Sequence, residues 1–550
     1  MSGEQTIKNN PPIDGAQFRV LMNAGLTWLR TNQESVNALN VFPVPDGDTG
    51  TNMVLTLQAA IDEIADVSNN DVGTLAGKLA HGALMGARGN SGVILSQIWR
   101  GFSKGIEKCQ NLDGAYLVEG LKQARDTAYK GVVKPVEGTI LTVCKDMALA
   151  GEQHLKETED PYQLLKLITE AAKVSVDYTP ELLDVLKEAG VVDAGGKGLM
   201  IIFEGMVRFI EGEPLDIEPV HVKPLSMIGQ QEAMNSAEPG QDYEVIVDFE
   251  PHEPLVLENF YEDLEKIGTS IQVGEGDGMY RMHIHVPTDK RYEPIDYTMT
   301  LGTISKVHIE NLMIQMGPGS KEEPIKLANI GPDDIALITI SPGIGFSRIF
   351  ASLGAAAIVG GGQTMNPSTQ EILEAFEDLP TDKIIILPNN KNILMAAKSA
   401  AEVSVKQVKV IPTVTVPQGL AAMLRLIPGQ ELENVVADME SAIKEIESGE
   451  ITTSVRDVEI DGITVKEGEI ISLHNGKLVA SNKNLSDGCL IFLEIAKAEE
   501  FELLTMFYGE NTTPEKAQEM AEMIEGKYPD LEIELQYGGQ PHYQFILSIE

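Results

Sequence analysis

Residues 40–53 read NVFPVPDGDTGTNM, from Asn40 to Met53. Asp46 and Asp48 lie one residue apart among residues with little side-chain bulk, so a hard cation such as Mg²⁺ can take oxygen ligands from both and keep waters and phosphate oxygens. Gly47 and Gly50 permit backbone angles that other residues avoid. The stretch therefore predicts a metal and phosphate site.

Polar donors and a helix follow the two carboxylates. Thr49, Thr51 and Asn52 supply hydroxyl and amide groups that can point at phosphate oxygens. The apolar residues from Met53 to Leu57 then predict the start of a helix.

Three other interpretations of the stretch compete with this one. An EF-hand loop beginning at Asp46 would have Leu57 at its twelfth position, where a bidentate carboxylate is required, so it is excluded. Asp48-Thr49-Gly50 matches the aspartic-protease signature, but such enzymes need two of these aspartates and the chain has one Asp-Thr-Gly. A plain Pro/Gly turn with capping Asp and Thr side chains stays open.

Composition restricts the class of protein. A chain of 550 residues exceeds one hydrophobic core, which indicates three or four domains. A net charge of −41 repels nucleic acid and anionic membranes, although a solvated acidic surface explains most of that charge. Three dispersed cysteines exclude a disulfide framework. Without an apolar run of membrane-spanning length, a cytoplasmic protein with no membrane span is expected.

The first 212 residues predict a mainly helical domain. Phe18, Leu21, Met22, Gly25, Leu26 and Leu29 share one face of a helix. Further helices are predicted over 72–104, 112–130, 138–155, 161–176 and 180–189. Within the first of these ranges, the Gly-rich turn 86–92 leads into a helix, whose N-terminal N–H groups would suit an anion. A simple helix–helix turn is the alternative for this segment.

Two later turns have similar composition. Gly138-Thr139 opens a helix, and Asp193-Ala194-Gly195 precedes the last helix of the domain. Glycine caps between consecutive helices explain both equally well.

Residues 220–320 predict a small α+β domain after a Pro- and charge-rich linker. Strands are expected at 243–249, 270–273 and 280–286, with helices at 257–266 and 291–300. His283 and His285 project to the same face of a strand, where they could share a metal or act on a phosphate. Two exposed strand histidines are the alternative.

Residues 325–550 predict an α/β region. Short apolar runs at 335–340, 383–387 and 408–411 are typical of a parallel sheet. Polar loops at 361–368 and 387–392 lie where such sheets bind ligands, although helix capping by Ser368 and Asn390 explains them too. Residues 451–497 are expected to be β-rich, and 501–550 to run strand, helix, strand, strand.

The stretch 40–53 resembles the signature of the bacterial fatty acid kinase A-subunit family, whose first domain is related to the nucleotide-binding subunit of dihydroxyacetone kinases. Residues 87–94, 134–140, 192–198 and 538–541 also resemble family strings, so the resemblance spans nearly the full chain. It implies a multidomain protein with an all-α nucleotide-binding helical barrel, a small α+β middle domain and an α/β C-terminal region.

The resemblance also implies ligands for each site. Mg²⁺ would be held by Asp46 and Asp48, with Asn40 where relatives use a third aspartate. The expected nucleotide-binding residues are Thr49, Gly50, Thr51, Asn52, Met53, Asn90, Ser91, Gly92, Gly138, Thr139, Asp193 and Gly195. Family members pair a His-x-His strand with a zinc-binding Cys; here Glu244 stands in its place beside His283 and His285.

The activity that the resemblance implies is a kinase reaction. ATP would phosphorylate a fatty acid carboxylate, presented by a separate acyl-binding protein, to an acyl phosphate used in phospholipid synthesis. Asp46, Asp48 and His285 are the expected catalytic residues, and a homodimer is expected through the C-terminal region. A small-polyol kinase and a non-enzymatic nucleotide-binding module remain as alternatives.

Overall fold

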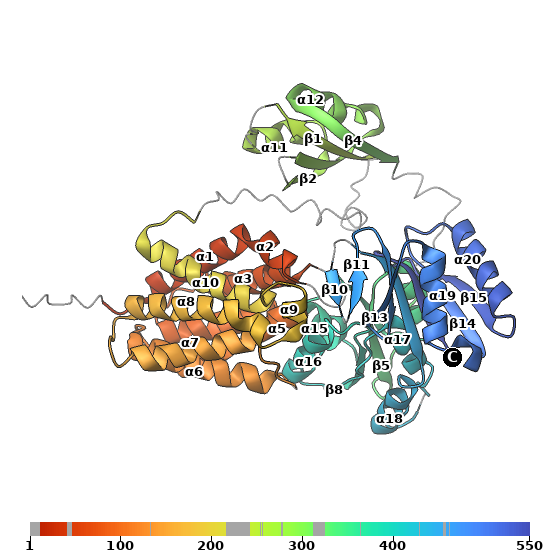
Figure 1. The fold of residues 1–550 in the computed structure, drawn as a ribbon. Helices are drawn as coiled ribbons and strands as arrows, with labels where there is room; N and C mark the ends of the chain where they lie inside the picture. The colour runs from red at the N-terminus through yellow and green to blue at the C-terminus, as the bar shows by residue number, and fades with distance from the viewer. Residues whose placement is uncertain are drawn as a thin grey trace, which may run out of the picture. The chain divides into compact units, whose positions relative to one another are not determined.

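The computed structural model describes residues 11–550 except 41–46, 66, 133, 216–242, 253–254, 256, 277–278, 312–324, 364, 428, 455–457 and 461. The chain divides into two compact units: residues 1–216 together with 325–550, and residues 217–324. The second unit is therefore an insertion between the two halves of the first. Figure 1 shows the elements of each.

The N-terminal half of the first unit is helical, as predicted. The helices are α1 (Gly15–Thr31), α2 (Gln33–Ala38), α3 (Thr49–Ala65), α4 (Val72–Met85), α5 (Gly89–Gly105), α6 (Gly114–Gly131), α7 (Ile140–His154), α8 (Pro161–Tyr178), α9 (Asp184–Glu188) and α10 (Ala194–Glu211). Side-chain caps begin several of them, including Asp14, Asp113, Asp160 and Asp193. The expected helix over 180–189 is shorter, because a 3₁₀ turn occupies 179–181.

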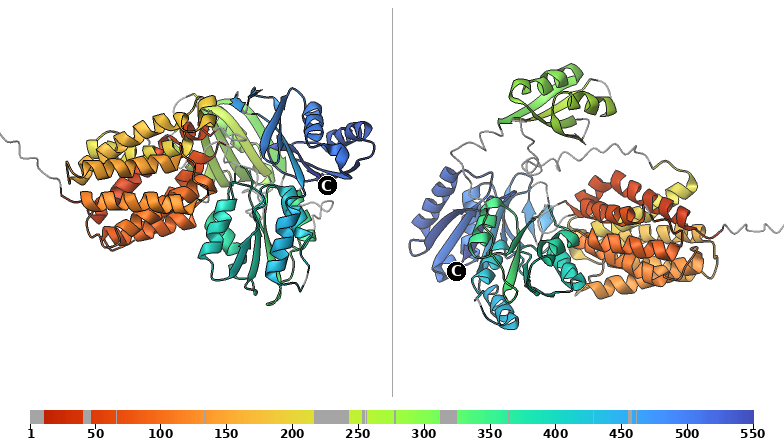
Figure 2. Two further views of the ribbon diagram at one scale, coloured as in Figure 1. Left: turned by 60° about the horizontal axis from the view of Figure 1, so that its bottom comes forward. Right: turned by 180° about the vertical axis from the view of Figure 1, so that it is seen from behind.

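Consecutive long helices pack against one another, and α10 returns to pack on α1. Their apolar faces meet in one core that draws on Ile13 and Phe18 at the beginning of the half and on Phe203 and Met206 near its end. Because each long helix packs beside the one before it, successive long helices run in alternating directions; Figure 2 shows them lying side by side. The N-termini of α3, α5, α7 and α10 consequently lie at one end of this half.

The second unit is a four-stranded antiparallel sheet with helices on one face. Its elements are β1 (Tyr243–Pro251), α11 (Leu257–Glu265), β2 (Thr269–Gly276), β3 (Met279–Val286), the 3₁₀ turn η4 (Thr288–Lys290), α12 (Glu293–Leu301) and β4 (Gly302–Asn311), with strand order β2-β3-β1-β4. Strand β4 was not predicted from the sequence. The Pro- and charge-rich linker expected from Glu211 to Pro224 is described only as far as Leu215, and the linker expected at 317–320 lies outside the described residues.

The C-terminal half of the first unit begins with a parallel sheet, confirming that prediction. It comprises β5 (Ile335–Ser341), α14 (Ile344–Ser352), β6 (Ala357–Gly360), α15 (Thr369–Glu377), β7 (Lys383–Leu387), α16 (Leu394–Val403), β8 (Gln407–Val410), α17 (Val416–Met423) and α18 (Leu432–Ala442). The strand order is β6-β5-β7-β8 and every pairing is parallel.

A second, six-stranded sheet follows. Its elements and the short β10–β11 ribbon are β9 (Glu447–Thr453), β10 (Val458–Ile460), β11 (Ile463–Val465), β12 (Ile470–His474), β13 (Lys477–Asn482), α19 (Leu485–Ile495), η5 (Ala498–Glu500), β14 (Leu503–Tyr508), α20 (Pro514–Lys527), β15 (Glu532–Tyr537) and β16 (Tyr543–Ile549). The order is β13-β12-β9-β16-β14-β15. The final strand, helix, strand, strand order is as predicted.

The β-rich prediction for 451–497 is wrong over its last part, where α19 lies. The apolar run from Cys489 to Leu493 resembles a strand, but the buried residues Cys489, Phe492 and Leu493 have helical spacing. Asn484 caps the helix by accepting the N–H of Asp487 at 2.9 Å. Periodicity over five residues cannot distinguish these two structures.

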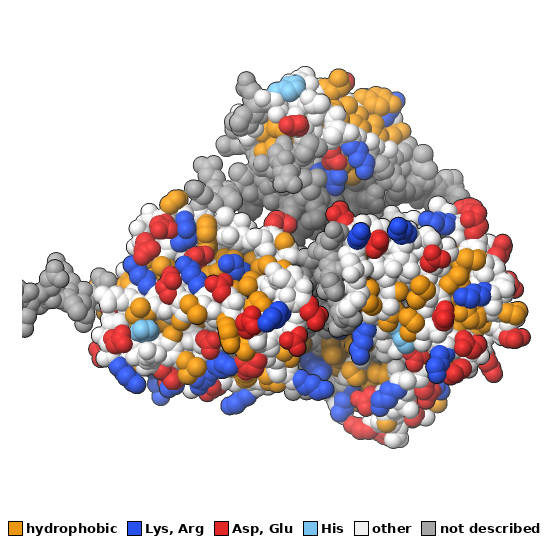
Figure 3. All heavy atoms as spheres, in the orientation of Figure 1, with side chains coloured by type: hydrophobic (Ala, Val, Ile, Leu, Met, Phe, Trp, Pro, Cys, Tyr) orange, Lys and Arg blue, Asp and Glu red, His pale blue; other side chains and the backbone are white. Residues whose placement is uncertain are grey.

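Acidic and basic side chains are mixed on the surface. Figure 3 shows carboxylate side chains spread among lysines and arginines over both halves of the first unit.

The three cysteines, Cys109, Cys144 and Cys489, are buried free thiols, and burial raises the pKa of each to about 12. Among the helices of the described residues, none combines the length and apolar content needed to cross a bilayer.

Candidate functional site

Asp48 lies at the N-terminus of α3. Its backbone carbonyl accepts the N–H of Asn52 at 2.8 Å, and its side chain is 8% exposed. Burial raises the pKa of Asp48 to about 6, although hydrogen bonds from Asn52 and Asn366 act in the opposite direction. Asp46 lies outside the described residues, and Asn40 ends the turn after α2, where its N–H donates to Asn37 at 3.1 Å.

The residues after Asp48 in the predicted loop pack either against α2 or into the helical core. The hydroxyl of Thr51 accepts hydrogen bonds from Gln33 at 3.0 Å and Asn37 at 3.2 Å. A Cβ on Gly50 would lie 2.5 Å from the carbonyl oxygen of Gln33, so glycine permits this close packing of α2 on α3. Thr49 is buried, and the Met53 side chain lies in the helical core.

The Gly-rich turn places the N-terminus of α5 beside that of α3. Gly89 has φ of +57°, and a Cβ there would lie 2.6 Å from the Asn52 side chain. A Cβ on Gly92 would collide with the hydroxyl of Thr56, which donates to the carbonyl of Asn52 at 2.7 Å. The predicted phosphate residues Asn90, Ser91 and Gly92 thus form the first turn of a helix that starts next to Asp48.

The third and fourth predicted turns also come together. The carboxylate of Asp193 accepts the N–H of Gly196 at 2.6 Å and also that of Ile140, so it joins the N-termini of α10 and α7. Burial raises the pKa of Asp193 to about 6 despite these bonds. Thr139 caps α7, and Gly138, with φ of +81°, donates to Thr142 at 2.8 Å.

The N-termini of α3 and α5 lie near those of α7 and α10, because α10 packs against α3. A Cβ on Gly198, one turn into α10, would lie 2.6 Å from the sulfur of Met53, one turn into α3. Gly195 packs beside Ile140 in the same region. The N-termini of these four helices, with the positive ends of their dipoles, therefore share one end of the helical half, an environment suited to an anionic ligand.

The donors at this end fit a hard cation. Asp48 offers a buried carboxylate whose bonding partners are uncharged amides, and the buried Oδ1 atom of Asn366 beside it has no hydrogen-bond partner in the described structure. Oxygen ligands of this kind suit Mg²⁺. Among the residues described, which do not include Asp46, there is no cluster of three His, Cys, Asp or Glu side chains.

Asn366 belongs to the C-terminal half, and it was not predicted from the sequence. Its Nδ2 donates to Asp48 Oδ2 at 2.5 Å, and it precedes the capping box of α15 formed by Ser368 and Glu371. The polar loop 361–368 contains Asn366 and was the sequence feature that could have indicated it. Helix capping by Ser368 explained the composition of that loop equally well. The other expected cap is wrong: Asn390 accepts the N–H of Asn392 in a turn, and α16 begins after Ile393.

Several further contacts hold α15 and α16 against the start of α5. Arg88 forms an ion pair with Glu371 at 3.0 Å and donates to the carbonyl oxygen of Asn366, also at 3.0 Å. The N–H of Thr369 donates to the carbonyl of Ala87 at 3.2 Å, and Asn90 reaches Asn392 at 3.5 Å. The Arg88 side chain is thus engaged at this contact.

Apolar packing accompanies these polar contacts. Ala87 and Val93 are buried in a cluster with Ile338, Ile372 and Phe376 of the parallel sheet and its helices. The helical half and the C-terminal half therefore share a core at the end where Asp48 lies.

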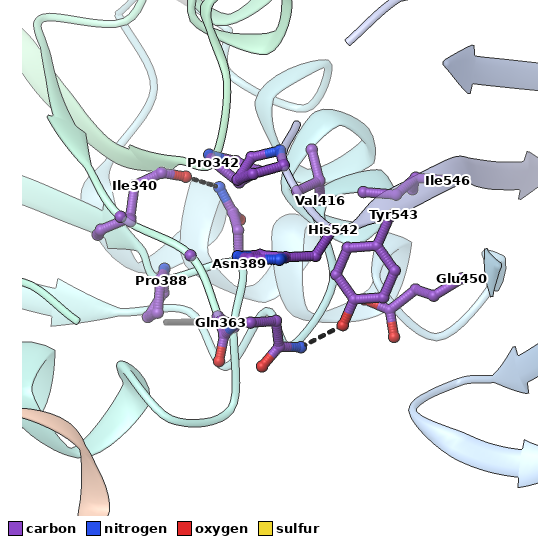
Figure 4. Close-up of a pocket in the computed structure, with 14 residues that line it drawn as sticks. Ile340, Pro342, Gln363, Pro388, Asn389, Val416, Glu450, His542, Tyr543 and Ile546 are labelled. Carbon is purple, nitrogen blue, oxygen red and sulfur yellow. Dashed lines mark hydrogen bonds between the residues drawn. The ribbon is translucent and has the colours of Figure 1, made fainter. Parts of the chain in front are cut away.

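A second polar site lies between the two C-terminal sheets (Figure 4). A cavity of about 30 Å³ is bounded by residues after β5, β6 and β7 and by Glu450, His542 and Tyr543. Asn389 has φ of +56° and donates to the carbonyl of Ile340 at 2.8 Å, while Gln363 donates to the Tyr543 hydroxyl at 2.6 Å.

The two middle-domain histidines are buried, so the alternative of exposed strand histidines is wrong. His283 is 3% exposed and His285 is 0% exposed, on the inner strand β3, with ring centroids 4.9 Å apart. Glu244 is paired with His285 across β1 and β3, but its side chain is not among those described. Zinc at this position stays a prediction.

Comparisons with known proteins cover the same three regions. A model described as "DAK2 domain" matches residues 43–208, and models of the FakA-like middle domain and the FakA-like C-terminal region, both of the fatty acid kinase A-subunit type, match 238–317 and 336–550. Protein YloV of Bacillus subtilis (strain 168) is 39% identical over 550 residues, covering 98% of this chain and 99% of its own. An uncharacterized protein of Staphylococcus aureus (strain USA300) is 38% identical over 546 residues, with the same coverage.

Solved structures show weaker likeness. The dihydroxyacetone kinase from C. freundii in complex with AMP-PNP and Mg²⁺ is 22% identical, covers 38% of this chain and 37% of its own, and has a TM-score of 0.28. A fatty-acid-binding DegV family protein from Thermus thermophilus is 13% identical, covers 40% of this chain and 99% of its own, and has a TM-score of 0.30. Such scores do not establish a common fold. The family models and the full-length relatives carry the assignment: the chain belongs to the fatty acid kinase A-subunit family.

Proposed function

We propose that this chain is an ATP-dependent kinase subunit that phosphorylates a fatty acid carboxylate held by a separate acyl-binding protein. The observation that carries the proposal is the buried Asp48 carboxylate at the adjoining N-termini of α3 and α5, in a chain of this family. Burial disfavours the ionised form of Asp48, a cost that a bound cation would offset, and the helix ends favour phosphate. Together these groups suit Mg·ATP.

Different residues would bind the phosphates and the base of the nucleotide. The first turn of α5, with Asn90, Ser91 and Gly92, offers backbone N–H groups to the phosphates. The turns at Gly138-Thr139 and Asp193-Gly195 close the opposite side of the pocket around the base. This arrangement would make the helical half a nucleotide-binding barrel.

Mg²⁺ would be held by Asp46 and Asp48, with Asn40 nearby, and would neutralise charge on the phosphates. In the reaction an oxygen of the fatty acid carboxylate bonds to the γ-phosphorus as the bond between that phosphorus and ADP breaks. The products are an acyl phosphate and ADP. Because the acceptor is already ionised, no residue of the chain has to remove a proton.

The remaining parts would serve the acceptor and assembly. We assign residues 1–212 to the kinase domain, 220–320 to a middle domain and 325–550 to a region for partner binding or dimerisation, in a cytoplasmic protein. The catalytic role expected for His285 in phosphoryl transfer stays a prediction. Its ring is buried within the middle domain.

ATP consumption by the purified chain tests the proposal, with fatty acid supplied alone and bound to acyl-binding proteins of the host. ADP and acyl phosphate should form only with the loaded acyl-binding protein. Asp48→Asn should reduce the rate at least a hundredfold, because it removes the charge that holds the cation, while Asp62→Asn, on the exposed face of the same helix, should not.

Three outcomes would contradict parts of the proposal. Turnover of dihydroxyacetone without an acyl-binding protein would favour a small-polyol kinase. Tight nucleotide binding with no turnover of any acceptor would favour a regulatory module. Wild-type activity of Asp48→Asn would remove Asp48 from the site.

A further inference from the structure

Asn366 faces the candidate metal site from the other half of the chain. It is 318 residues away from Asp48 in sequence, yet its Nδ2 lies 2.5 Å from Asp48 Oδ2. The side chain is 4% exposed, and its Nδ2 is also 3.5 Å from the position that a Cβ on Gly89 would take. The amide therefore lies between the start of α3 and the start of α5, where the phosphates are proposed to bind.

The oxygen of this amide is not used. Oδ1 of Asn366 is buried and has no hydrogen-bond partner in the described structure. A buried carbonyl without a partner has lost its hydrogen bonds to water, so such atoms are uncommon unless a ligand or an ion completes them. Asn366 thus gives one donor to Asp48 and keeps one acceptor unsatisfied at the same place.

The backbone at Asn366 is held firmly. Arg88 donates to its carbonyl oxygen at 3.0 Å, and Pro367 and the Ser368 capping box follow at once. Only the side-chain torsions remain to be set. A half-turn of the amide about its last bond exchanges Nδ2 for Oδ1 with almost no change in volume.

We propose that Asn366 is an oxygen ligand of the cation that Asp48 binds, so that the C-terminal half completes the metal site of the helical half. The proposal rests on the proposed function. Without a cation, the amide NH₂ satisfies the carboxylate; with a cation, Oδ1 takes that position.

The alternative is that Asn366 only fastens the two halves together. The ion pair between Arg88 and Glu371 already serves that purpose, and it does not involve the Asn366 side chain. A variant that keeps an oxygen at this position distinguishes the metal-ligand role of Asn366 from a role in fastening the two halves. Asn366→Asp keeps a ligand oxygen but places two carboxylates together when no cation is bound.

Mn²⁺ binding in the presence of ADP, followed by the electron paramagnetic resonance signal of free Mn²⁺, tests the proposal on the full chain. Asn366→Ala should weaken Mn²⁺ binding about tenfold. Asn366→Asp should bind within a few-fold of wild type, and Mn²⁺ should raise its Tm more than it raises that of wild type. Gln370→Ala, exposed on α15, is the matched control and should bind as wild type does.

Three results would overturn the inference: wild-type Mn²⁺ binding by Asn366→Ala, loss of binding by Asn366→Asp equal to that of the alanine variant, or an equal loss caused by Glu371→Gln. The last would mean that fastening the halves is sufficient. Asp48→Asn separates this failure from that of the proposed function. If Asp48→Asn also binds Mn²⁺ normally, the site itself is misassigned.

Discussion

At the scale of single residues, the site depends on how buried charge is balanced. Asp48 lies at a helix N-terminus and meets only uncharged donors among the described residues, and burial raises its pKa to about 6. A cation placed beside it would restore the ionised form and offset the cost of burial. The carboxylate is therefore better suited to binding a metal than to stabilising the fold.

Glu450, half-buried on β9 at the cavity between the two C-terminal sheets, predicts a dependence of stability on pH. Burial in the sheet raises its pKa from 4.5 to about 7, while Lys391 acts in the opposite direction. The folded protein therefore holds the proton more tightly than the unfolded chain does. The contribution of this group to stability should be greatest below about pH 4.5, fall as the pH rises to about 7, and stay level above it.

Glu450→Gln should abolish this contribution, because an amide of the same shape does not ionise. Between pH 5 and pH 8 its Tm should rise relative to that of wild type, corresponding to at most about 3 kcal/mol at about 1.4 kcal/mol per pKa unit. Thermal unfolding at several pH values measures the effect. Glu440→Gln, exposed on α18, is the control, and equal pH profiles for both variants would contradict the prediction.

At the scale of elements, the site is made by helix ends that approach closely. The approach of α5 to α3 depends on Gly92, where a Cβ would collide with the Thr56 hydroxyl. That hydroxyl in turn donates to Asn52, which bonds to Asp48. A shift of one helix would therefore reach the carboxylate through two contacts.

Gly92→Ala should destabilise the protein by about 1–3 kcal/mol, because the added methyl group must push the helices apart. It should also weaken ADP binding, which a titration calorimeter measures alongside the Tm. Gly77→Ala, on α4 with open space around its Cβ position, should instead stabilise by about 0.5–1 kcal/mol. The same Tm for the two variants would show that the close approach of α5 to α3 at Gly92 does not affect stability.

The sequence was informative where chemistry is local. Asp48, Gly92 and Asp193 lie in short strings of Gly, Asp and Thr, and the structure brings those strings to one end of the helical half. Asn366 could not be chosen, because its relevance depends on a contact across 318 residues. Strand β6 and helix α19 were missed for a different reason: short or continuously apolar runs do not distinguish strand from helix.

At the scale of the whole molecule, one compact unit is built from two separated halves of the chain, with residues 217–324 inserted between them. The helical half has its own core, formed by residues from Ile13 to Met206. Ala87 and Val93 are the exceptions, because they pack with the C-terminal sheet. The helical half should therefore fold alone, at the cost of exposing that small apolar surface.

A fragment of residues 1–215 should give a helical circular dichroism spectrum and bind Mg·ADP, since every proposed nucleotide contact lies within it. It should hold Mn²⁺ about tenfold more weakly than the full chain, because it lacks Asn366, and it should not phosphorylate fatty acid. Mn²⁺ titration of the fragment and the full chain, side by side, measures the difference. Equal affinities would contradict the contribution of the C-terminal half.

The contact between Asp48 and Asn366 also sets an order of events during synthesis. At about 5–20 residues per second, the ribosome reaches Asn366 roughly 15–60 s after Asp48. Asn366 can join the helical half only after it has left the ribosome and the parallel sheet around it has formed. An unfinished chain would thus carry the helical half without Asn366, and the tight metal binding proposed above would belong only to the completed polypeptide.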